Sequence, residues 1–240
     1  GTLLRPIHGS KGELRVNRVK RIVGMFAVAA VAVSGAVAQE LLNIEDAARL
    51  MRRNQEEIRQ YSWKSTYTYI VDGAQRRVDE YRMRYDSDGF LEKIQERSDV
   101  AKGKLRAADG KKLNKKEREE AFNFVMDVKS QLDGYFNPMF AEKAVARSVV
   151  TSEGEVLHLD SQHVITAGDS VKLEIERSTK RPLTAHIKTV VDGSPVDYQV
   201  TFGSMEYGPN YIASSVATTE WQGIKLVMKD ENSNFTKNLN

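Results

Sequence analysis

The 240-residue sequence contains no cysteine, which excludes a disulfide framework and any site that depends on a thiolate. Proline is scarce, with five residues, and no Pro- or Ser-rich linker divides the chain. Long repeats and Gly-rich phosphate loops are also missing. The absence of internal boundaries favours one domain with a sizeable core, which ~200 residues can form.

One long apolar run stands near the start of the sequence, at residues 22–38, directly after the cationic pair Lys20-Arg21. As a helix it would span ~25 Å at ~1.5 Å per residue, which is shorter than the ~30 Å hydrocarbon core of a membrane. It ends in Ala-Val-Ala at 36–38, the small-x-small pattern that signal peptidase accepts. The sequence therefore predicts a signal peptide cleaved after Ala38 and a periplasmic or secreted protein. A retained single-span anchor is the alternative.

Removal of this segment changes the charge of the chain. The residues before Arg18 do not fit a signal peptide, and we expect translation to begin naturally at Val16, read from a GTG codon. Residues 39–240 carry 30 basic and 32 acidic side chains, a formal charge of −2, so the pI near 8.9 describes the precursor. Since nucleic-acid binding needs a basic excess, we expect no nucleic acid among the partners.

The first part of the processed chain predicts a helix followed by three antiparallel strands. Residues 43–59 show helical spacing after Asn43, a good N-cap. From Tyr61 the apolar period changes to two, and the Asp-Gly pair at 72–73 predicts a tight hairpin turn because type I′ turns need positive φ. A second strand leads through a turn at 87–89 into a third strand that begins with FLEKIQE.

Two helices are expected in the middle of the chain, and strands follow them. Asn114 and Glu117 fit a capping box, Gly134 fits a C-cap glycine, and a shorter helix is expected from Pro138 to about residue 147. We count about nine strands, mostly linked by hairpins. This pattern predicts an α+β fold, with a strongly curved antiparallel sheet or unclosed β-barrel. The N-terminal helix and the two-helix mid-chain insertion would act as a lid.

Aromatic and apolar side chains share one face of the first two strands, where they alternate with polar ones. This face needs a cover, which the predicted helices can supply. Acyl chains of a ligand would occupy any remaining gap, whereas in the alternative Phe124 and Val128 fill it as ordinary core. The candidate ligand-lining residues are Trp63, Tyr67, Tyr69, Tyr81, Met83, Tyr85, Phe124 and Val128.

Two short segments contain residue types that could support catalysis. HLDSQH places His158, Asp160 and His163 close together, and all three are ligand types for zinc or another divalent metal. AGDSVK contains Asp169 and Ser170, but it lacks the strand-to-helix context of a G-x-S-x-G nucleophile. A polar strand end and a β-turn explain these segments without any catalytic role. We therefore expect a protein that is not an enzyme and has no cofactor or metal, with a metal-assisted hydrolase as an alternative.

Residues 101–118 form a basic segment with only two acidic residues, Asp109 and Glu117. The segment could contact an anionic membrane surface, where each basic residue can add ~1 kcal/mol, or another envelope protein. A solvated connector is the alternative. The basic residues are Lys102, Lys104, Arg106, Lys111, Lys112, Lys115, Lys116 and Arg118.

The chain resembles the LolA/LolB-like lipoprotein-carrier fold in the order of its elements over about residues 40–230. The stretches RRNQEEIRQYSWKSTYTYIVDG, YRMRYDSDGFLEKI and GDSVKLEIERSTKRPLTAHIKTVVDGSPVDYQVTF also look like uncharacterised secreted bacterial proteins associated with this fold. In that family an unclosed β-barrel under a helical lid binds acyl chains. The resemblance implies that residues 39–240 form a single LolA-like domain, a monomeric periplasmic module that holds a lipid, a lipoprotein acyl chain or another hydrophobic ligand. A secreted scaffold or interaction protein of the cell envelope is the alternative.

Overall fold

The computed structural model describes residues 44–102, 106, 110–136, 143–144 and 147–238. The predicted signal peptide, its cleavage site and the start at Val16 lie outside these residues, as does most of the helix expected from Pro138. In chain order, the elements are α1 (Ile44–Ile58), β1 (Tyr61–Val71), β2 (Ala74–Tyr85), β3 (Leu91–Val100), α2 (Lys115–Tyr135), β4 (Val149–Glu153), β5 (Val156–Gln162), β6 (Ser170–Glu176), β7 (Pro182–Val191), β8 (Ser194–Ser204), β9 (Asn210–Trp221) and β10 (Ile224–Lys237).

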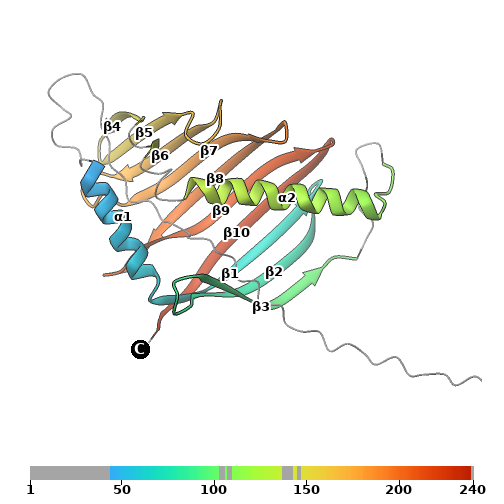
Figure 1. Ribbon diagram of the computed structural model, residues 1–240, viewed down its shortest axis with the longest axis horizontal. Coiled ribbons are helices and arrows are strands. Elements are labelled where there is room, and N and C mark those ends of the chain that lie inside the picture. Colours follow the sequence, from blue (N-terminus) through green and yellow to red (C-terminus); the bar gives the residue numbers. More distant parts are fainter. Residues whose placement is uncertain (1–43, 103–105, 107–109, 137–142, 145–146, 239–240) are drawn as a thin grey trace, which may run out of the picture.

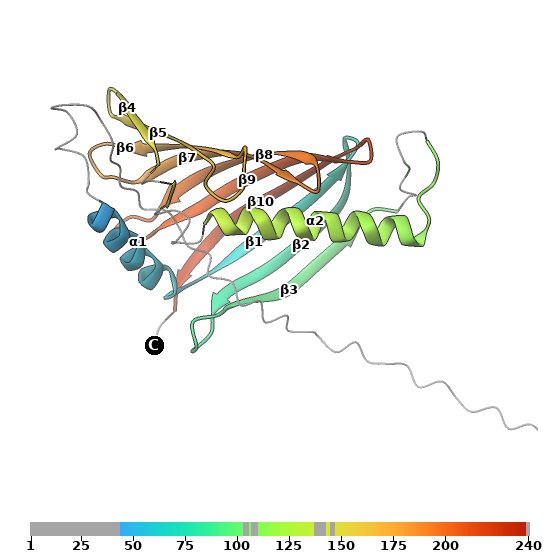
Figure 2. The same ribbon diagram turned by 45° about the horizontal axis from the view of Figure 1, so that its top comes forward.

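The strands of the described chain form one antiparallel sheet in the order β3-β2-β1-β10-β9-β8-β7-β6-β5-β4. Neighbours in the sheet are also neighbours in the chain, except that β1 pairs with β10. The sheet curls but stays open, with β3 and β4 at its two edges (Figures 1 and 2). The predicted α+β class and the curved, unclosed antiparallel sheet are therefore confirmed.

Three of the predicted hairpins turn on pairs of residues with positive φ. The pairs at 72–73, 192–193 and 222–223 have φ values between 48° and 80°. This is the type I′ geometry, whose twist matches the twist of the flanking strands. At the first turn, Asp72 Oδ1 also accepts a hydrogen bond from the backbone N–H of Lys225 at 2.9 Å, which joins the β1–β2 hairpin to β10.

The sheet has ten strands within the described residues, against about nine expected from the sequence. The strand absent from that expectation is β4, which has five residues and lies at the edge of the sheet. Only Val150 is buried on it, so β4 lacks the alternation that identifies a half-buried strand.

Helix α2 begins as predicted and ends later. The side chain of Asn114 accepts a hydrogen bond from the Glu117 backbone N–H at 3.0 Å, and Glu117 accepts one from the Asn114 N–H at 2.6 Å, which completes the capping box. The prediction that Gly134 is a C-cap glycine is wrong, because the helix continues through Tyr135. Gly134 instead lies against Ile165, whose Cδ1 would be 3.4 Å from an added Cβ.

Helix α2 lies across one face of the curled sheet, and α1 lies beside one end of the strands (Figures 1 and 2). Buried side chains of α2, including Phe124 and Val128, pack with Trp221 and Leu226 in a hydrophobic cluster. On α1, Asn54 accepts a hydrogen bond from the Asn210 N–H at 2.7 Å and donates one to the Asn210 carbonyl oxygen at 3.1 Å. Both helices are therefore fixed to the strands. Within the described residues, neither is long and apolar enough to cross a membrane.

Candidate functional site

A cavity of about 860 Å³ lies between α2 and the part of the sheet formed by β1–β3 and β8–β10. Its volume is within the ~300–1,000 Å³ range of small-molecule and cofactor sites. The wall combines aromatic and aliphatic side chains from the strands with residues on the flank of α2. The cavity is the candidate site because it brings together the residues that the sequence pattern places on one face of the first strands.

Six of the eight predicted lining residues belong to this wall. Trp63, Tyr67 and Tyr69 alternate along β1, and antiparallel pairing sets them beside the inward face of β2. The aromatic rings contact each other: the Trp63 and Tyr85 centroids are 6.0 Å apart, and Tyr67 meets Tyr81 edge-on at 5.6 Å. The other lining residue from β2 is Met83.

The other two predicted lining residues, Phe124 and Val128, do not line the cavity. They are buried in the core between α2 and the sheet, with exposed fractions of 5% and 0%. Phe124 and Val128 pack on the strands, as in the alternative in which they are ordinary core. The neighbouring flank of the helix faces the cavity and supplies residues such as Ala121, Val125 and Lys129.

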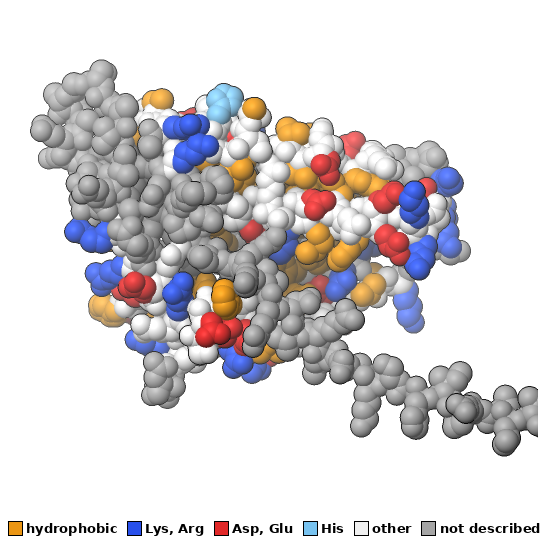
Figure 3. Space-filling model, viewed as in Figure 1, with side chains coloured by type: hydrophobic (Ala, Val, Ile, Leu, Met, Phe, Trp, Pro, Cys, Tyr) orange, Lys and Arg blue, Asp and Glu red, His pale blue; other side chains and the backbone are white. Residues whose placement is uncertain are grey.

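Two large apolar side chains on α2 line the cavity and are also open to solvent. Phe122 is 55% exposed and Met126 is 41% exposed. Figure 3 shows hydrophobic side chains gathered along α2 and beside it on this face of the molecule. The α2 side of the cavity is therefore partly covered by side chains that solvent reaches.

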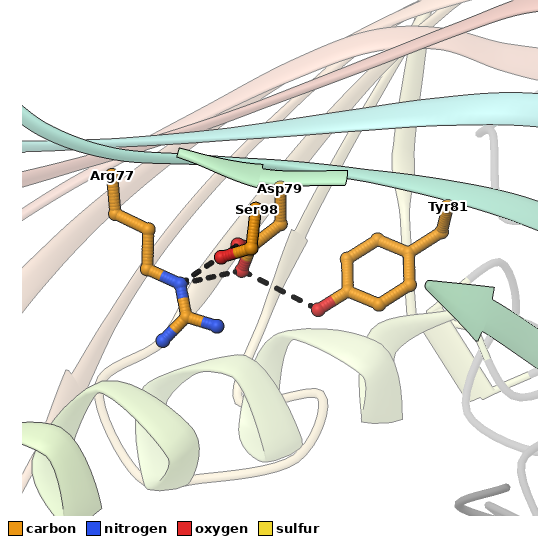
Figure 4. Close-up of polar contacts among 4 residues, drawn as sticks. All are labelled: Arg77, Asp79, Tyr81 and Ser98. Atoms are coloured by element: carbon orange, nitrogen blue, oxygen red, sulfur yellow. Dashed lines mark hydrogen bonds and ion pairs between the residues drawn. The ribbon is translucent and has the colours of Figure 1, made fainter. Parts of the chain in front are cut away.

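Sequence reasoning missed a polar cluster on the cavity side of β2. Asp79 is 2% exposed, and it accepts hydrogen bonds from Arg77 Nε at 2.8 Å, Ser98 Oγ at 2.6 Å and the Tyr81 hydroxyl at 3.4 Å (Figure 4). The alternation of β2 could have predicted this cluster, because Arg77 and Asp79 have the same strand parity as the lining residues Tyr81, Met83 and Tyr85. From the sequence, only apolar and aromatic side chains are assigned to this face.

A second polar group joins α2 to β1 and β10. Lys129 Nζ lies 4.3 Å from the ring centroid of Tyr67, within cation–π range. Burial lowers the pKa of Lys129, but the nearby carboxylates of Asp133 and Asp230 outweigh burial and hold the pKa above its ordinary value. Lys93 also approaches Tyr67, with Nζ 3.4 Å from the hydroxyl oxygen.

Burial raises the pKa of the lining tyrosines Tyr67, Tyr69 and Tyr81, and it raises the pKa of Tyr85 to about 12. Burial also raises the pKa of Asp230, which accepts a hydrogen bond from Ser65 Oγ at 2.6 Å. The tyrosine hydroxyls are therefore neutral near pH 7. The cavity combines large uncharged aromatic surfaces with a few charged groups.

The candidate metal ligands each contact other residues. His158 Nδ1 lies 3.5 Å from Glu174, while Asp160 lies 3.4 Å from Lys172 Nζ. The ring of His163 accepts a hydrogen bond from the backbone N–H of Gly168 at 2.9 Å. Within the described residues, no three His, Asp or Glu side chains could hold a metal ion together. The metal-assisted alternative therefore lacks a ligand set in this part of the chain.

Asp169 has a structural role in the AGDSVK segment, which contains the candidate nucleophile Ser170. The buried carboxylate accepts hydrogen bonds from the backbone N–H groups of Val164, Ile165 and Thr166 and from the Tyr135 hydroxyl. Ser170 begins β6, so a turn before a strand explains the pattern.

The basic segment is described only at residues 101–102, 106 and 110–118. Arg106 Nη1 donates a hydrogen bond to the Gly110 carbonyl oxygen at 2.7 Å. At the start of α2, Lys115 and Lys116 pair with the acidic residues one turn further on, at 3.7 and 3.6 Å. These pairs are exposed, and they offset part of the positive charge of the segment.

No protein-family model matches the sequence, and no curated protein is significantly similar to it. Among solved structures, a LolA superfamily protein from Nitrosomonas europaea is similar, with 11% identity, a TM-score of 0.34, and coverage of 79% of this chain and 93% of that one. A domain from Vibrio parahaemolyticus, described as an outer membrane lipoprotein-sorting protein, has 9% identity and a TM-score of 0.36, with coverage of 81% and 93%.

A third similar structure is the complex of MucB with MucA(peri). Its matched chain has 12% identity and a TM-score of 0.22, with coverage of 81% of this chain and 100% of that one.

Proposed function

We propose that the chain is a non-enzymatic binding protein that holds a lipid, a lipoprotein acyl chain or another hydrophobic ligand between its sheet and helix α2. The observation that carries this proposal is the cavity of about 860 Å³ beside α2, with Trp63, Tyr67 and Tyr69 along one wall. Helix α2 acts as the lid, since Phe122 and Met126 both line the cavity and reach solvent.

The helix fills one part of the sheet face and leaves another part open. Phe124 and Val128 pack against the strands as ordinary core, while the cavity persists on the flank of α2 that contains Ala121 and Val125. A chain of ten methylenes buried there would gain ~8 kcal/mol at ~0.8 kcal/mol per group. That gain is comparable to the ~4–15 kcal/mol cost of association, so a long chain can bind while a short one cannot.

The setting of this function follows from the sequence. We propose that residues 39–240 form the single LolA-like domain, released by cleavage after Ala38 into the periplasm or the medium. The ligand would then be a lipid, or the acyl chain of a lipoprotein, of the cell envelope. The protein would act as a monomer, because one chain supplies both the sheet and the lid.

The test uses the tryptophans of the protein. The chain has two, Trp63 and Trp221, and both line the cavity. Brominated hexadecanol should quench their fluorescence saturably, whereas brominated butanol should not. Ala121→Phe fills part of the cavity and should weaken the quenching by brominated hexadecanol about tenfold. Asn123→Phe adds the same ring at an exposed position of α2 outside the cavity wall and should leave it unchanged.

Native mass spectrometry with lipid extraction supplements this assay. Protein recovered from the periplasm should carry an extractable lipid, and Ala121→Phe protein should carry less of it. If long-chain compounds do not quench the wild-type protein and the recovered protein is empty, the proposed function is wrong.

A further inference from the structure

The polar side of the cavity contains an arginine that a buried carboxylate holds in place. Arg77 Nε lies 2.8 Å from Asp79, whose oxygens also accept hydrogen bonds from Ser98 and Tyr81. The terminal nitrogens of Arg77 point away from Asp79 in Figure 4, and they donate to no other residue of the described chain. Arg77 therefore lines the cavity with two N–H-bearing nitrogens that remain available.

A second cation enters the same region from α2. Lys129 Nζ lies over the Tyr67 ring, and within the described residues it has no hydrogen-bond acceptor. Asp133 and Asp230 keep Lys129 protonated. Burial raises the pKa of Tyr69, and the charges of Lys129 and Arg77 both oppose this rise, so both cations lie close enough to Tyr69 to act on it.

The carboxylates in this region already accept several hydrogen bonds, whereas the cations donate few. Asp79 already accepts from three side chains, and Asp230 accepts from Ser65 and from Asn232 Nδ2 at 3.4 Å. Among the groups described in this part of the cavity, the two cations Arg77 and Lys129 keep donors that no described residue uses. A ligand group that satisfies such donors carries negative oxygen atoms, as carboxylates and phosphates do.

We infer that Arg77 and Lys129 form a subsite for the oxyanion head of a long-chain amphiphile, either a carboxylate or a phosphate, whose chain lies along the aromatic wall. This inference rests on the proposed function and adds the chemistry of the ligand's polar end. Arg77 supplies a planar fork that suits two oxygen atoms, and Asp79 positions the fork. Lys129 supplies a point charge from the opposite side of the cavity.

The experiment compares head groups on one chain, using quenching of the cavity tryptophans below the concentration at which the amphiphiles form micelles. The probes are brominated hexadecanoate, brominated hexadecyl phosphate, brominated hexadecanol and brominated hexadecyltrimethylammonium at neutral pH. Because a charge-assisted hydrogen bond is stronger than a neutral one, both anions should bind about tenfold more tightly than the alcohol. The ammonium compound should bind no better than the alcohol.

Matched variants assign the preference to the two cations. Arg77→Met and Lys129→Met should each lose most of the anion preference, measured as the ratio of anion affinity to alcohol affinity in the same variant. Arg82→Met is the control, since Arg82 lies on the same strand with the opposite parity and pairs with Glu96. Lys129→Met leaves the Arg77–Asp79 pair intact, so it remains informative if Arg77→Met does not fold.

The outcomes of this experiment distinguish a failure of the oxyanion subsite from a failure of the proposed function. Equal affinity for all head groups, or an anion preference that survives in both variants, overturns the subsite while the proposed function stands. Inorganic phosphate alone should not displace brominated hexadecanoate at millimolar concentration. Displacement by inorganic phosphate overturns the amphiphile in favour of a free anion. If none of the four probes quenches the wild-type protein, the proposed function fails together with the subsite.

Discussion

The buried carboxylate of Asp169 organises the segment before β6, and its removal should destabilise the protein measurably. One oxygen, Oδ1, accepts from Val164 N–H at 2.6 Å. The other, Oδ2, accepts from Ile165 N–H at 2.8 Å, Thr166 N–H at 2.9 Å and the Tyr135 hydroxyl at 2.7 Å. Asp169→Asn replaces one acceptor oxygen by a donor, which faces other donors if it occupies the Oδ2 position.

The cost follows from these contacts. A hydrogen bond to a charged group contributes about 1.5–3 kcal/mol, and bonds that share one acceptor do not add independently. We therefore expect Asp169→Asn to lower the free energy of unfolding by roughly 3 kcal/mol, a large fraction of the ~5–15 kcal/mol of an ordinary domain. Tyr135→Phe removes a single bond and should cost about 1–2 kcal/mol.

Urea unfolding as a function of pH provides the assay. Burial raises the pKa of Asp169, but hydrogen bonds, first that from Thr166, outweigh burial and hold the pKa below its ordinary value. A carboxylate with a depressed pKa contributes stability above its unfolded pKa of about 3.9, and the contribution is lost as the pH falls through the folded pKa. Asp169→Asn should therefore be less sensitive to acid below about pH 4. A variant within about 0.5 kcal/mol of wild type at neutral pH would refute this reasoning.

Two further substitutions test the local signals that define the fold. Asn114→Ala removes the capping box with Glu117. It should lower the free energy of unfolding by about 1 kcal/mol and speed amide hydrogen exchange in the first turn of α2. Unchanged exchange in that turn would contradict a stabilising cap. Gly73→Val puts a β-branched residue at a φ of 78°, where an added Cβ would meet no atom within 4 Å. Backbone strain should therefore cost about 1–2 kcal/mol in thermal unfolding. Gly134→Val is the comparison, because φ is not positive at Gly134 and the added side chain would instead contact Ile165. An equal loss of stability in Gly73→Val and Gly134→Val would argue against backbone strain at Gly73.

Local chemistry made much of the fold predictable. The Asp-Gly pairs at 72–73 and 192–193 and the Gln-Gly pair at 222–223 predict turns with positive φ, which the structure has. Each of these turns sets the register of its hairpin. The pairing of β1 with β10 had no such signal, because the two strands meet across most of the chain length. Gly134 was misread for a related reason: its contact is with Ile165, which is distant in sequence, rather than with the helix end.

The aromatic part of the candidate site followed from strand parity, but the helix contribution did not. Parity placed Trp63 and Tyr67 on the wall without any knowledge of the helix. The rotation of α2 on the sheet decides whether its apolar stripe or its flank meets the cavity, and this depends on packing against residues such as Trp221. Charged residues at inward positions, such as Asp79, were overlooked because the cost of their burial is met by specific partners, here Arg77 and Tyr81 on the same strand and Ser98 on β3.

The register of β1 on β10, with Tyr61 opposite Lys237, constrains when the cavity can exist during synthesis. Strands β1–β3 emerge first from the ribosome and can form their own hairpins, yet one side of β1 has no partner until the last strand is made. During that interval three strands expose their aromatic face and an open edge, the features that promote aggregation of nascent chains. Assembly of the binding site is therefore a late event, and a chain shortened before β10 would lack both the partner of β1 and part of the cavity wall.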